Sequence, residues 1–547
     1  MKKWFSLMLM LCMLLTGAAF AQEATGLEQD VVVLFTSDVH CGVEQGFGYV
    51  GVAAIRDAME AAGNHVLLVD NGDSIQGEPI GTMTTGSANV ELMNAVGYDI
   101  AIPGNHEFDY GMDRFLELAQ AAKFPYISAN FNKLGELVFA PYVIREFDGV
   151  KIAFVGVTTP KTLTSSTPKY FQNEAGEFVY GFMQDETGEK LYAAVQSAVD
   201  SARAEGAAYV VAMTHLGNET DCRPWTYADV IANTTGIDAL LDGHSHDMDQ
   251  AEVLNKEGQK VLRAACGTKL QGVGYLRIGA DGTLASGLYT WDNEISAPEL
   301  FGIENDVAAA VEAATQTLNE KLNEVVAASE VDLTIYDPAT NVRIIRCAET
   351  NLGDLCADAY LDQAGADIAF VNGGGIRVSI DAGDITLNDI LMVHPFGNAL
   401  CVVEATGKQI LDALEMGVSS IPEENGSFQH VAGMTMEIHT YIPSSVTTDE
   451  NGMFTGITGE YRVKNVMVGG EPLDLEKTYT LASHNYLLKN SGGGMTMFNG
   501  CELLQNEVML DNQVLINYIT GTLGGVVGEA YANPYGQGRI VAVEEKP

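Results

Sequence analysis

Five short motifs place metal-binding side chains directly after runs of apolar residues. Imidazole nitrogens and carboxylate oxygens together suit Zn, Mn, Co or Fe better than an ion that prefers only oxygen. In Asp-x-His and His-x-His, alternate side chains of an extended segment point to one side, so each motif can hold an ion with two ligands. The motifs are Asp38-Val39-His40, Gly72-Asp73, Gly104-Asn105-His106-Glu107, Thr214-His215 and Gly243-His244-Ser245-His246.

The number of ligands predicts two metal ions. Seven side chains are too many for one tetrahedral ion, so we expect two divalent ions that share a bridging carboxylate. Each motif is weak alone, because a single histidine or a Gly-Asp turn is usually structural. Five other histidines lack such neighbours and keep a structural interpretation: His65, His394, His430, His439 and His484. The candidate ligands are Asp38, His40, Asp73, Asn105, His215, His244 and His246.

The motifs need a scaffold that brings strand ends together. The apolar runs before them are short and rich in β-branched residues, which is typical of buried strands. Helical patterns over Val52–Ala62 and Met112–Ala122 lie between the runs. This alternation predicts a layered α/β domain, in which ligands collect beyond the carboxyl ends of the strands. The runs are Val31–Phe35, Val66–Val69, Ile100–Ile102, Ile152–Val157, Tyr209–Met213 and Ala239–Leu241.

The pattern changes after Pro298. From Glu304 to Glu330, apolar residues recur at spacings of three and four, which predicts one amphipathic helix. This helix either links two domains or lies on the surface. Strand-like runs and Gly-rich turns then alternate to about Val543, which indicates an α+β domain. We expect a domain over 28–297, a linker helix within 298–331 and a second domain over 332–543. The later runs are Ile368–Val371, Ala399–Glu404 and Met434–His439.

The length and net charge of the chain limit the functions that it can have. A chain of 547 residues is too long for a single core. Lys plus Arg is 29 and Asp plus Glu is 73, a net charge of -44, so DNA or RNA is not expected as a partner. An anionic small molecule must be attracted by local positive charge, from metal ions or a few arginines. No oligomeric state is predicted.

The first residues have the pattern of an export signal. Lys2 and Lys3 precede the apolar run Trp4–Leu15, and Ala19-Phe20-Ala21 fits a cleavage site. The apolar run is too short for a membrane anchor. We predict a signal peptide over 1–21 and a secreted or periplasmic protein without an anchor. Seven of the eight cysteines lie beyond this segment, and disulfides or buried thiols both remain open.

At these motifs the sequence resembles the calcineurin-like metallophosphoesterases, and more closely the 5'-nucleotidase and 2',3'-cyclic phosphodiesterase family. The resemblance covers the whole mature chain. It implies an N-terminal four-layer αββα metallophosphoesterase domain, joined by a helix to a smaller α+β substrate-binding domain. By this resemblance His106 acts on the substrate and Asp109 orients it. One metal is held by Asp38, His40, Asp73 and His246, and the other by Asp73, Asn105, His215 and His244.

A glycine-rich motif follows the run Ile368–Val371. It reads Asn372-Gly373-Gly374-Gly375-Ile376-Arg377. Glycines let backbone N–H groups approach an anion, and an arginine can hold a phosphate with two hydrogen bonds. The resemblance implies that Arg377 binds the substrate phosphate, with Asn372 and Gly374 beside it. Arg343 or Arg346 either assists or is structural.

The same resemblance implies that two aromatic rings sandwich a base. Phe428 and Tyr486 match these rings, and Asn398 is expected to bond to the base, although a lone aromatic more often packs in a core. Relatives carry an aspartate that contacts the ribose, where this chain has Gly493. That loss weakens the case for nucleosides but leaves phosphoester hydrolysis untouched.

We therefore expect hydrolysis of nucleoside 5'-monophosphates to nucleoside and phosphate by two divalent ions (Zn, Mn, Co or Fe). Activity on 2',3'-cyclic nucleotides or UDP-sugars is also compatible with the resemblance. Gly493 raises a first alternative, a broader phosphoesterase for a non-nucleotide ester. A second alternative is a secreted binding protein without activity on the same fold.

Overall fold

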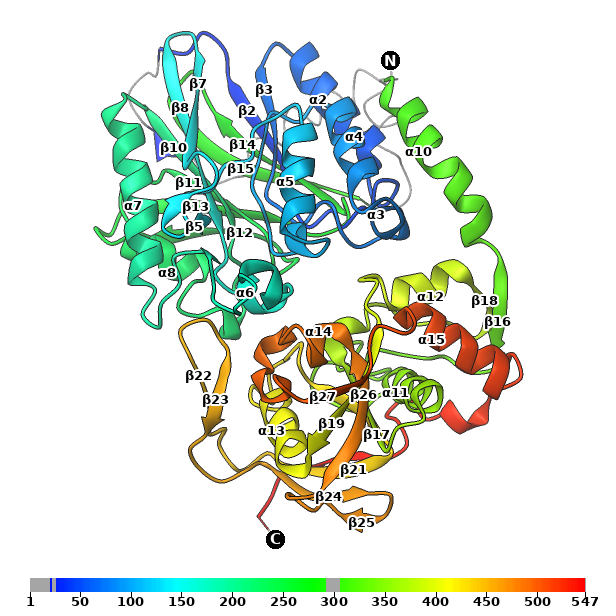
Figure 1. The fold of residues 1–547 in the computed structure, drawn as a ribbon. Helices are drawn as coiled ribbons and strands as arrows, with labels where there is room; N and C mark the ends of the chain where they lie inside the picture. The colour runs from blue at the N-terminus through cyan, green and yellow to red at the C-terminus, as the bar shows by residue number, and fades with distance from the viewer. Residues whose placement is uncertain (1–19, 22–25, 292–304, 547) are drawn as a thin grey trace. The chain divides into compact units, whose positions relative to one another are not determined.

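The computed structural model describes residues 20–21, 26–291 and 305–546 (Figure 1). It divides into two compact units. Unit 1 extends to Gln316, except for Thr164–Lys169, and unit 2 contains Thr164–Lys169 and the chain from Thr317 onward. Of the expected signal peptide, only Phe20–Ala21 (β1) lies within the described residues.

Unit 1 contains two six-stranded sheets. In both sheets the central strands are parallel, so their carboxyl ends meet at one edge. The first sheet has the order β1, β15 (Thr283–Thr290), β14 (Gly272–Ile278), β2 (Val31–Thr36), β3 (His65–Asp70) and β4 (Ile100–Ala101). The second has the order β12 (Met248–Leu254), β13 (Lys260–Cys266), β11 (Ala239–Asp242), β10 (Tyr209–His215), β8 (Val150–Thr158) and β7 (Tyr142–Phe147).

Alternation along the strands builds four layers in unit 1. In β2, Val33 packs into the core between the sheets, whereas Leu34 packs into the core beneath the helices. Three helices cover the first sheet: α2 (Gly48–Ala61), α4 (Ser87–Val96) and α5 (Met112–Ala121). Helices α7 (Glu189–Ala204) and α8 (Tyr227–Asn233) cover the second sheet. The predicted αββα architecture is confirmed (Figure 1).

Short elements complete unit 1, and two of them, α6 and η2, extend into the segment Thr164–Lys169 that belongs to unit 2. The turns η1 and η3 and helix α3 lie close to the strand ends in sequence, and a small three-stranded sheet has the order β6, β5, β9. Their bounds are α3 (Pro79–Thr84), η1 (His106–Phe108), β5 (Asn132–Lys133), β6 (Glu136–Leu137), α6 (Thr162–Ser165), η2 (Pro168–Phe171), β9 (Tyr180–Gly181) and η3 (Thr220–Cys222).

The expected linker helix is shorter than predicted. Helix α10 covers Val307–Leu322, and Val325–Ser329 forms strand β16. Strand β16 pairs with β18 (Gly383–Thr386) and β28 (Val526–Val527). The helical spacing up to Val325 is therefore misleading at its end, because Val-Val-Ala-Ala-Ser fits an extended strand with two partners. The division between the units falls inside α10.

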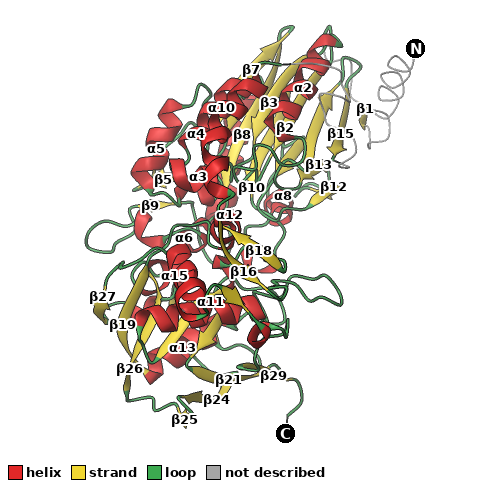
Figure 2. Ribbon diagram, turned by 90° about the vertical axis from the view of Figure 1, so that its right-hand side faces the viewer, coloured by secondary structure: helices red, strands yellow, loops and turns green. Residues whose placement is uncertain are grey.

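Unit 2 is an α+β structure around a five-stranded sheet. In β17, Val371 packs in a core with α11 (Asn351–Ala364), whereas Phe370 packs in a core with α13 (Gly407–Gly417). Figure 2 shows the strands and helices of this unit in separate colours. The sheet order is β20 (Gln429–Ala432), β17 (Ile368–Asn372), β26 (Thr478–His484), β19 (Leu400–Thr406) and β27 (Glu502–Gln505).

The rest of unit 2 consists of a second sheet, a hairpin and short helices. The sheet has the order β25 (Glu471–Pro472), β24 (Val463–Val468), β21 (Met434–His439) and β29 (Ile540–Val543). The hairpin joins β22 (Val446–Thr448) to β23 (Phe454–Ile457). The helices are η4 (Gly373–Gly375), α12 (Leu387–Val393), α14 (Asn485–Leu488), η5 (Gly492–Gly494), η6 (Thr496–Phe498), α15 (Asp511–Asn517), the π-turn η7 (Tyr518–Thr522) and η8 (Glu529–Tyr531).

Two general features concern membrane and redox chemistry. Among the described residues, no helix has the length and apolar character needed to cross a bilayer. The seven described cysteines form no disulfide with one another. Five of these are buried, and Cys347 and Cys501 are half-buried.

Candidate metal centre

The loops after the parallel strands bring the predicted ligands of unit 1 together in two clusters. In each cluster, the candidate ligand atoms lie within 4.8 Å of one another. The seventh predicted ligand, Asn105, joins the second cluster because its Oδ1 lies 2.8 Å from His244 Nδ1. The first cluster contains Asp38, His40 and His246, and the second contains Asp73, His215 and His244.

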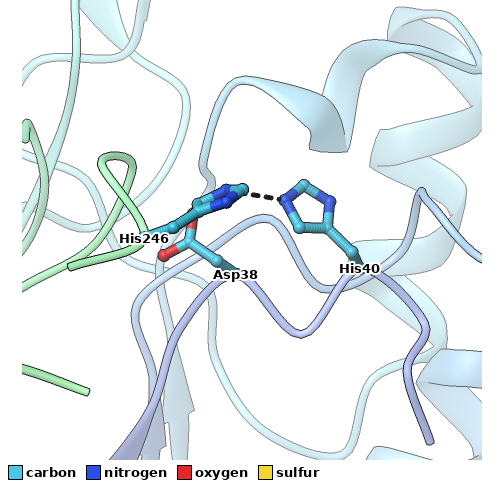
Figure 3. Close-up of side chains that lie close together, drawn as sticks. All are labelled: Asp38, His40 and His246. Carbon is cyan, nitrogen blue, oxygen red and sulfur yellow. Dashed lines mark hydrogen bonds and ion pairs between the residues drawn. The ribbon is translucent and has the colours of Figure 1, made fainter. Parts of the chain in front are cut away.

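In the first cluster, two imidazoles and a carboxylate face a common point (Figure 3). The Nε2 atoms of His40 and His246 are 3.1 Å apart, and His246 Nε2 is 3.4 Å from Asp38 Oδ1. His40 Nδ1 donates to the carbonyl of Gln76 at 3.0 Å, which leaves the lone pair of His40 on Nε2. A cation at this point would satisfy all three groups.

In the second cluster, a buried ring nitrogen lacks a hydrogen-bond partner within the described chain. His215 is fully buried, and its Nδ1 donates to the carbonyl of Asn71 at 2.7 Å. Its Nε2 faces Asp73 Oδ2 at 3.1 Å and makes no hydrogen bond of good geometry within the described chain. A buried polar atom of this kind needs a partner. Both clusters therefore fit divalent cations bound by nitrogen and oxygen ligands.

The backbone at these ligands is strained. Left-handed conformations are rare for residues with a side chain, and each costs about 1–3 kcal/mol unless the surroundings impose it. Such residues gather at functional sites because the sharp turn aims the side chain inward. Five of the predicted ligands have positive φ: Asp38 (50°), His40 (47°), Asp73 (58°), His244 (85°) and His246 (56°).

Glu107 holds two of the ligand loops together. Its buried carboxylate accepts N–H bonds from Asp73 at 2.8 Å, Ser74 at 2.8 Å and Gly104 at 2.6 Å. Burial raises the pKa of Glu107, and the Asp73 charge adds to that rise. Gly104 cannot carry a side chain, since a Cβ there would lie 2.3 Å from Asp73 Oδ1. The sequence motif placed Glu107 beside His106 but did not predict this supporting role.

The pKa values of Asp38 and Asp73 are shifted in opposite directions. Burial raises the pKa of Asp38 to about 7, in spite of nearby His215. Burial would also raise the pKa of Asp73, but the charge of His215 and other histidines holds it well below its usual range. Burial lowers the pKa of His215, yet the two carboxylates outweigh it and raise that pKa to about 10. A cation that binds here must displace the His215 proton.

His106 and Asp109 form a pair beside the first cluster. His106 Nδ1 donates to Asp109 Oδ2 at 2.5 Å, and the His106 backbone N–H donates to Asp73 Oδ1 at 2.7 Å. The rings of His106 and His40 have centroids 5.4 Å apart. Because Nδ1 is held by the carboxylate, Nε2 is the atom that His106 can present to a reactant.

A buried arginine clamps the His-x-His loop. Arg263 of β13 is fully buried and binds Asp242 at 3.1 Å and Asp247 at 2.6 Å, the residues on either side of the loop. Asp242 also accepts from Thr214 Oγ1 at 2.7 Å, next to His215. The arginine lies 4.2 Å from the ring centre of Tyr227. An arginine inside the apolar run Val261–Cys266 was the available sequence signal, because buried charges are rare without partners.

The glycine-rich loop of unit 2 is held by its own side chains. The Asn372 amide donates to Gly426 O at 2.7 Å, and its Oδ1 accepts from His484 Nε2 at 2.9 Å. The Gly374 N–H also donates to Gly426 O, at 2.9 Å. These contacts give Asn372 and Gly374 a structural task, and substrate contact stays a prediction for both.

The arginines around this loop differ in their contacts. Arg377 is half-exposed, and its guanidinium lies 5.5 Å from the ring centre of Phe396. Arg343 forms an ion pair with Glu424 through two nitrogens, which favours the structural alternative for this residue. The Arg346 carbonyl accepts from Asn425 N at 3.0 Å. The phosphate-binding role of Arg377 stays a prediction.

The two predicted stacking rings differ in their exposure. Phe428 is fully buried in a core that includes Phe370 and Leu414. Its contact with a base stays a prediction. Tyr486 is half-buried, and its hydroxyl accepts from Gly493 N at 2.9 Å. The Asn398 carbonyl accepts from Asp511 N at 2.8 Å, and its contact with a base stays a prediction.

Gly493 has no room for a side chain. Its φ is 63°, and a Cβ there would lie 1.9 Å from Ser427 Oγ. The serine hydroxyl thus fills the space where a ribose-binding aspartate would begin. An aspartate could stand at this position only if Ser427 moved.

Comparisons with known proteins cover both units. Residues 325–500 match the family model of the 5'-nucleotidase C-terminal domain, and residues 50–261 match that of the bacterial capsule synthesis protein PGA_cap. The chain is 32% identical over 451 residues to the trifunctional nucleotide phosphoesterase protein YfkN of Bacillus subtilis, covering 74% of this chain and 29% of that protein.

Two further relatives match over nearly their whole length. A 5'-nucleotidase of Vibrio vulnificus is 29% identical over 542 residues, covering 89% of this chain and 90% of that protein. The crystal structure of a 5'-nucleotidase precursor from Thermus thermophilus is similar with a TM-score of 0.76 and 28% identity, covering 94% of this chain and 100% of that one.

Proposed function

The chain belongs to the 5'-nucleotidase family, and we propose that it hydrolyses nucleoside 5'-monophosphates to nucleoside and phosphate with two divalent metal ions. The observation that carries this proposal is the convergence of the two ligand clusters beside the His106–Asp109 pair. A binding protein without activity would need the ligands but not an imidazole oriented by a carboxylate. The metals we propose are Zn, Mn, Co or Fe, since the ligands mix imidazole and carboxylate.

When bound, two divalent ions supply a water of lowered pKa and positive charge for the phosphate. The chain supplies position and proton transfer. Asp109 accepts a hydrogen bond from His106 Nδ1, so His106 as imidazolium donates a hydrogen bond or a proton from Nε2 to the leaving oxygen. Glu107 holds one ligand loop through a hydrogen bond to the backbone of Asp73, and Arg263 holds another through its ion pair with Asp247. Phosphoryl transfer depends mainly on such positioning and charge.

Substrate binding is proposed for unit 2. Arg377, held near Phe396, binds the phosphate, and Tyr486 offers a ring face for a base. The protein has a net charge of -44. It therefore needs local positive charge, from Arg377 and the proposed metal ions, to attract an anionic substrate. Export through the 1–21 segment, to the periplasm or the medium, is part of the same proposal.

A second candidate is a broader phosphoesterase for a non-nucleotide ester. Ser427 fills the space at Gly493, and Phe428 is buried, and both observations favour an ester without a nucleoside. The metal chemistry is the same in both candidates.

The test is a panel of substrates on metal-reconstituted full-length protein. AMP, 2',3'-cyclic AMP, UDP-glucose, a sugar phosphate and a phosphate bis-ester are compared by kcat/KM. The proposal expects AMP to be among the best substrates. A sugar phosphate or bis-ester that outpaces AMP by about tenfold (1.4 kcal/mol) would establish the second candidate instead.

A further inference from the structure

A third group of metal ligands lies on the outer side of the His-x-His loop. Glu219, Cys222 and His244 offer a carboxylate, a thiol and an imidazole whose ligand atoms lie within 4.8 Å of one another. It is the one group of this kind in the described chain that contains sulfur. A thiolate with imidazole and carboxylate is a ligand set typical of zinc.

The chain fixes this group through a short turn. Glu219 precedes the turn η3 and Cys222 is its last residue, and the Cys222 N–H donates to Glu219 O at 3.1 Å. This places both side chains three residues apart on one turn. The preceding N–H of Asn218 donates to Ser245 Oγ at 2.8 Å, which ties the turn to the loop that carries His244. The turn and the bond to the Ser245 hydroxyl therefore position the ligands.

His244 presents a different nitrogen to each side. Its Nδ1 lies 2.8 Å from Asn105 Oδ1, on the side of the second cluster. Its Nε2 lies 4.0 Å from Glu219 Oε2. Cys222 is fully buried, whereas 40% of the Glu219 side chain is exposed. An ion from solvent thus has an approach along Glu219 to the thiol.

We propose that Glu219, Cys222 and His244 form a third, regulatory site for a thiophilic divalent ion such as Zn²⁺. As the ion binds, the Cys222 S–H proton is released to solvent and a sulfur–metal bond forms. Because Nδ1 faces the second cluster, the ion at Nε2 also displaces the remaining ring proton of His244, which is released to solvent. The imidazolate is then shared by two ions whose positive charges repel each other, so occupation of this site weakens the inner cluster and excess zinc inhibits the enzyme.

Cobalt binding tests the site without any activity measurement. Metal-depleted full-length protein is titrated with Co²⁺, and the near-ultraviolet thiolate-to-cobalt charge-transfer band is recorded. We expect the band to appear in the wild type only after the two inner clusters of nitrogen and oxygen ligands are filled. It should vanish in Cys222→Ser and persist in Cys347→Ser, which removes a half-buried thiol of unit 2.

Glu219→Gln provides a variant that keeps the thiol. Its band should need about tenfold more cobalt, because one charged ligand is lost. A wild type without the band, or a Cys222→Ser protein that keeps it, would overturn the site. Because this binding assay needs no turnover, its failure is separate from a failure of the proposed function.

Zinc inhibition of phosphate release tests whether the third site regulates the enzyme. With stoichiometric metal, Cys222→Ser should match the wild type in phosphate release, and only the wild type should lose activity as zinc is added in excess. Equal zinc inhibition of both proteins would contradict the regulatory role.

Discussion

The Nε2 atoms of His40 and His246 face each other at 3.1 Å across 206 residues of sequence. Both imidazoles stand on left-handed backbone, and Asp38 completes the group. Two ring nitrogens aimed at one point beside a carboxylate fit a shared cation, and we propose that such a cation offsets the backbone strain.

Removal of one of these imidazoles should empty the first cluster. His246→Asn is expected to lower bound metal by about one ion per chain and to reduce phosphate release by at least about a hundredfold. Metal content is measured by elemental analysis after gel filtration. His65→Asn, at a half-buried histidine bonded to Asp148, is the matched control. A His246→Asn protein that keeps its full metal content would show that His246 is not a ligand.

His106 should affect rate and not metal content. Because Asp109 holds its Nδ1, we expect His106→Asn to lose about 10²–10⁴-fold in kcat. Asp109→Asn should lose less, since the imidazole remains but its tautomer is no longer fixed. Both variants are compared with the wild type by kcat and by metal per chain. If the metal content per chain falls as far as kcat does, His106 is a metal ligand and its assignment as the group that acts on the substrate is wrong.

Arg263 should act on metal affinity through the His-x-His loop. Arg263→Met removes the contacts to Asp242 and Asp247, and we expect metal affinity to fall about 10-fold to 100-fold. Calorimetric titration with Mn²⁺ measures this. Arg277→Met, which breaks an ion pair with Asp30 in the other sheet, is the control.

A double variant separates this clamp from general destabilisation. If Arg263 acts through Asp247, then Arg263→Met combined with Asp247→Asn should bind metal no more weakly than Arg263→Met alone. Additive losses would mean that the two residues act independently.

Acid should destabilise unit 2 through His430. Burial lowers the pKa of this histidine to about 4, whereas an unfolded histidine has a pKa near 6.5. Between these values the unfolded state binds a proton that the folded state does not, so stability falls as pH falls from 6.5 to 4. The loss is roughly 3 kcal/mol for this one group.

Hydrogen exchange in peptides that cover β17 and β20 reports this effect. Wild-type protection should fall more between pH 6.5 and 4.5 than that of His430→Gln, after correction for intrinsic exchange rates. Exchange in unit 1 serves as the internal reference. An equal pH dependence in both proteins would rule out His430 as the source.

The sequence predicted the parts of the site that depend on strand order. Asp38 and Asp73 follow buried parallel strands, and His215 is the last residue of another. Such strand ends meet at one edge whatever the details of the loops. The short length and the β-branched content of the apolar runs were enough to place those strands. The alternation of strands and helices predicted a layered α/β domain, and the four αββα layers came from the family resemblance. Val33 and Leu34, which pack on opposite faces of β2, illustrate those layers.

Features that depend on tertiary contacts were not predictable. The left-handed backbone at His40 is imposed by its surroundings, and no residue pattern near it in the sequence predicts it. Val325 continued a helical spacing but pairs as a strand, because β18 and β28 offer it partners. Phe428 matched a motif, yet its ring completes a core. Burial of this kind depends on residues that are far away in sequence.

Phosphate release from AMP, measured together with bound metal, shows whether two ions support hydrolysis in this protein. Metal-depleted full-length protein is reconstituted with Mn²⁺, Zn²⁺ or Co²⁺, and the metal bound per chain is measured in the same samples. We predict that phosphate release appears as two ions bind and is lost in the His246→Asn protein. Protein that carries two ions per chain but releases no phosphate from AMP or any other ester in the panel would contradict the account.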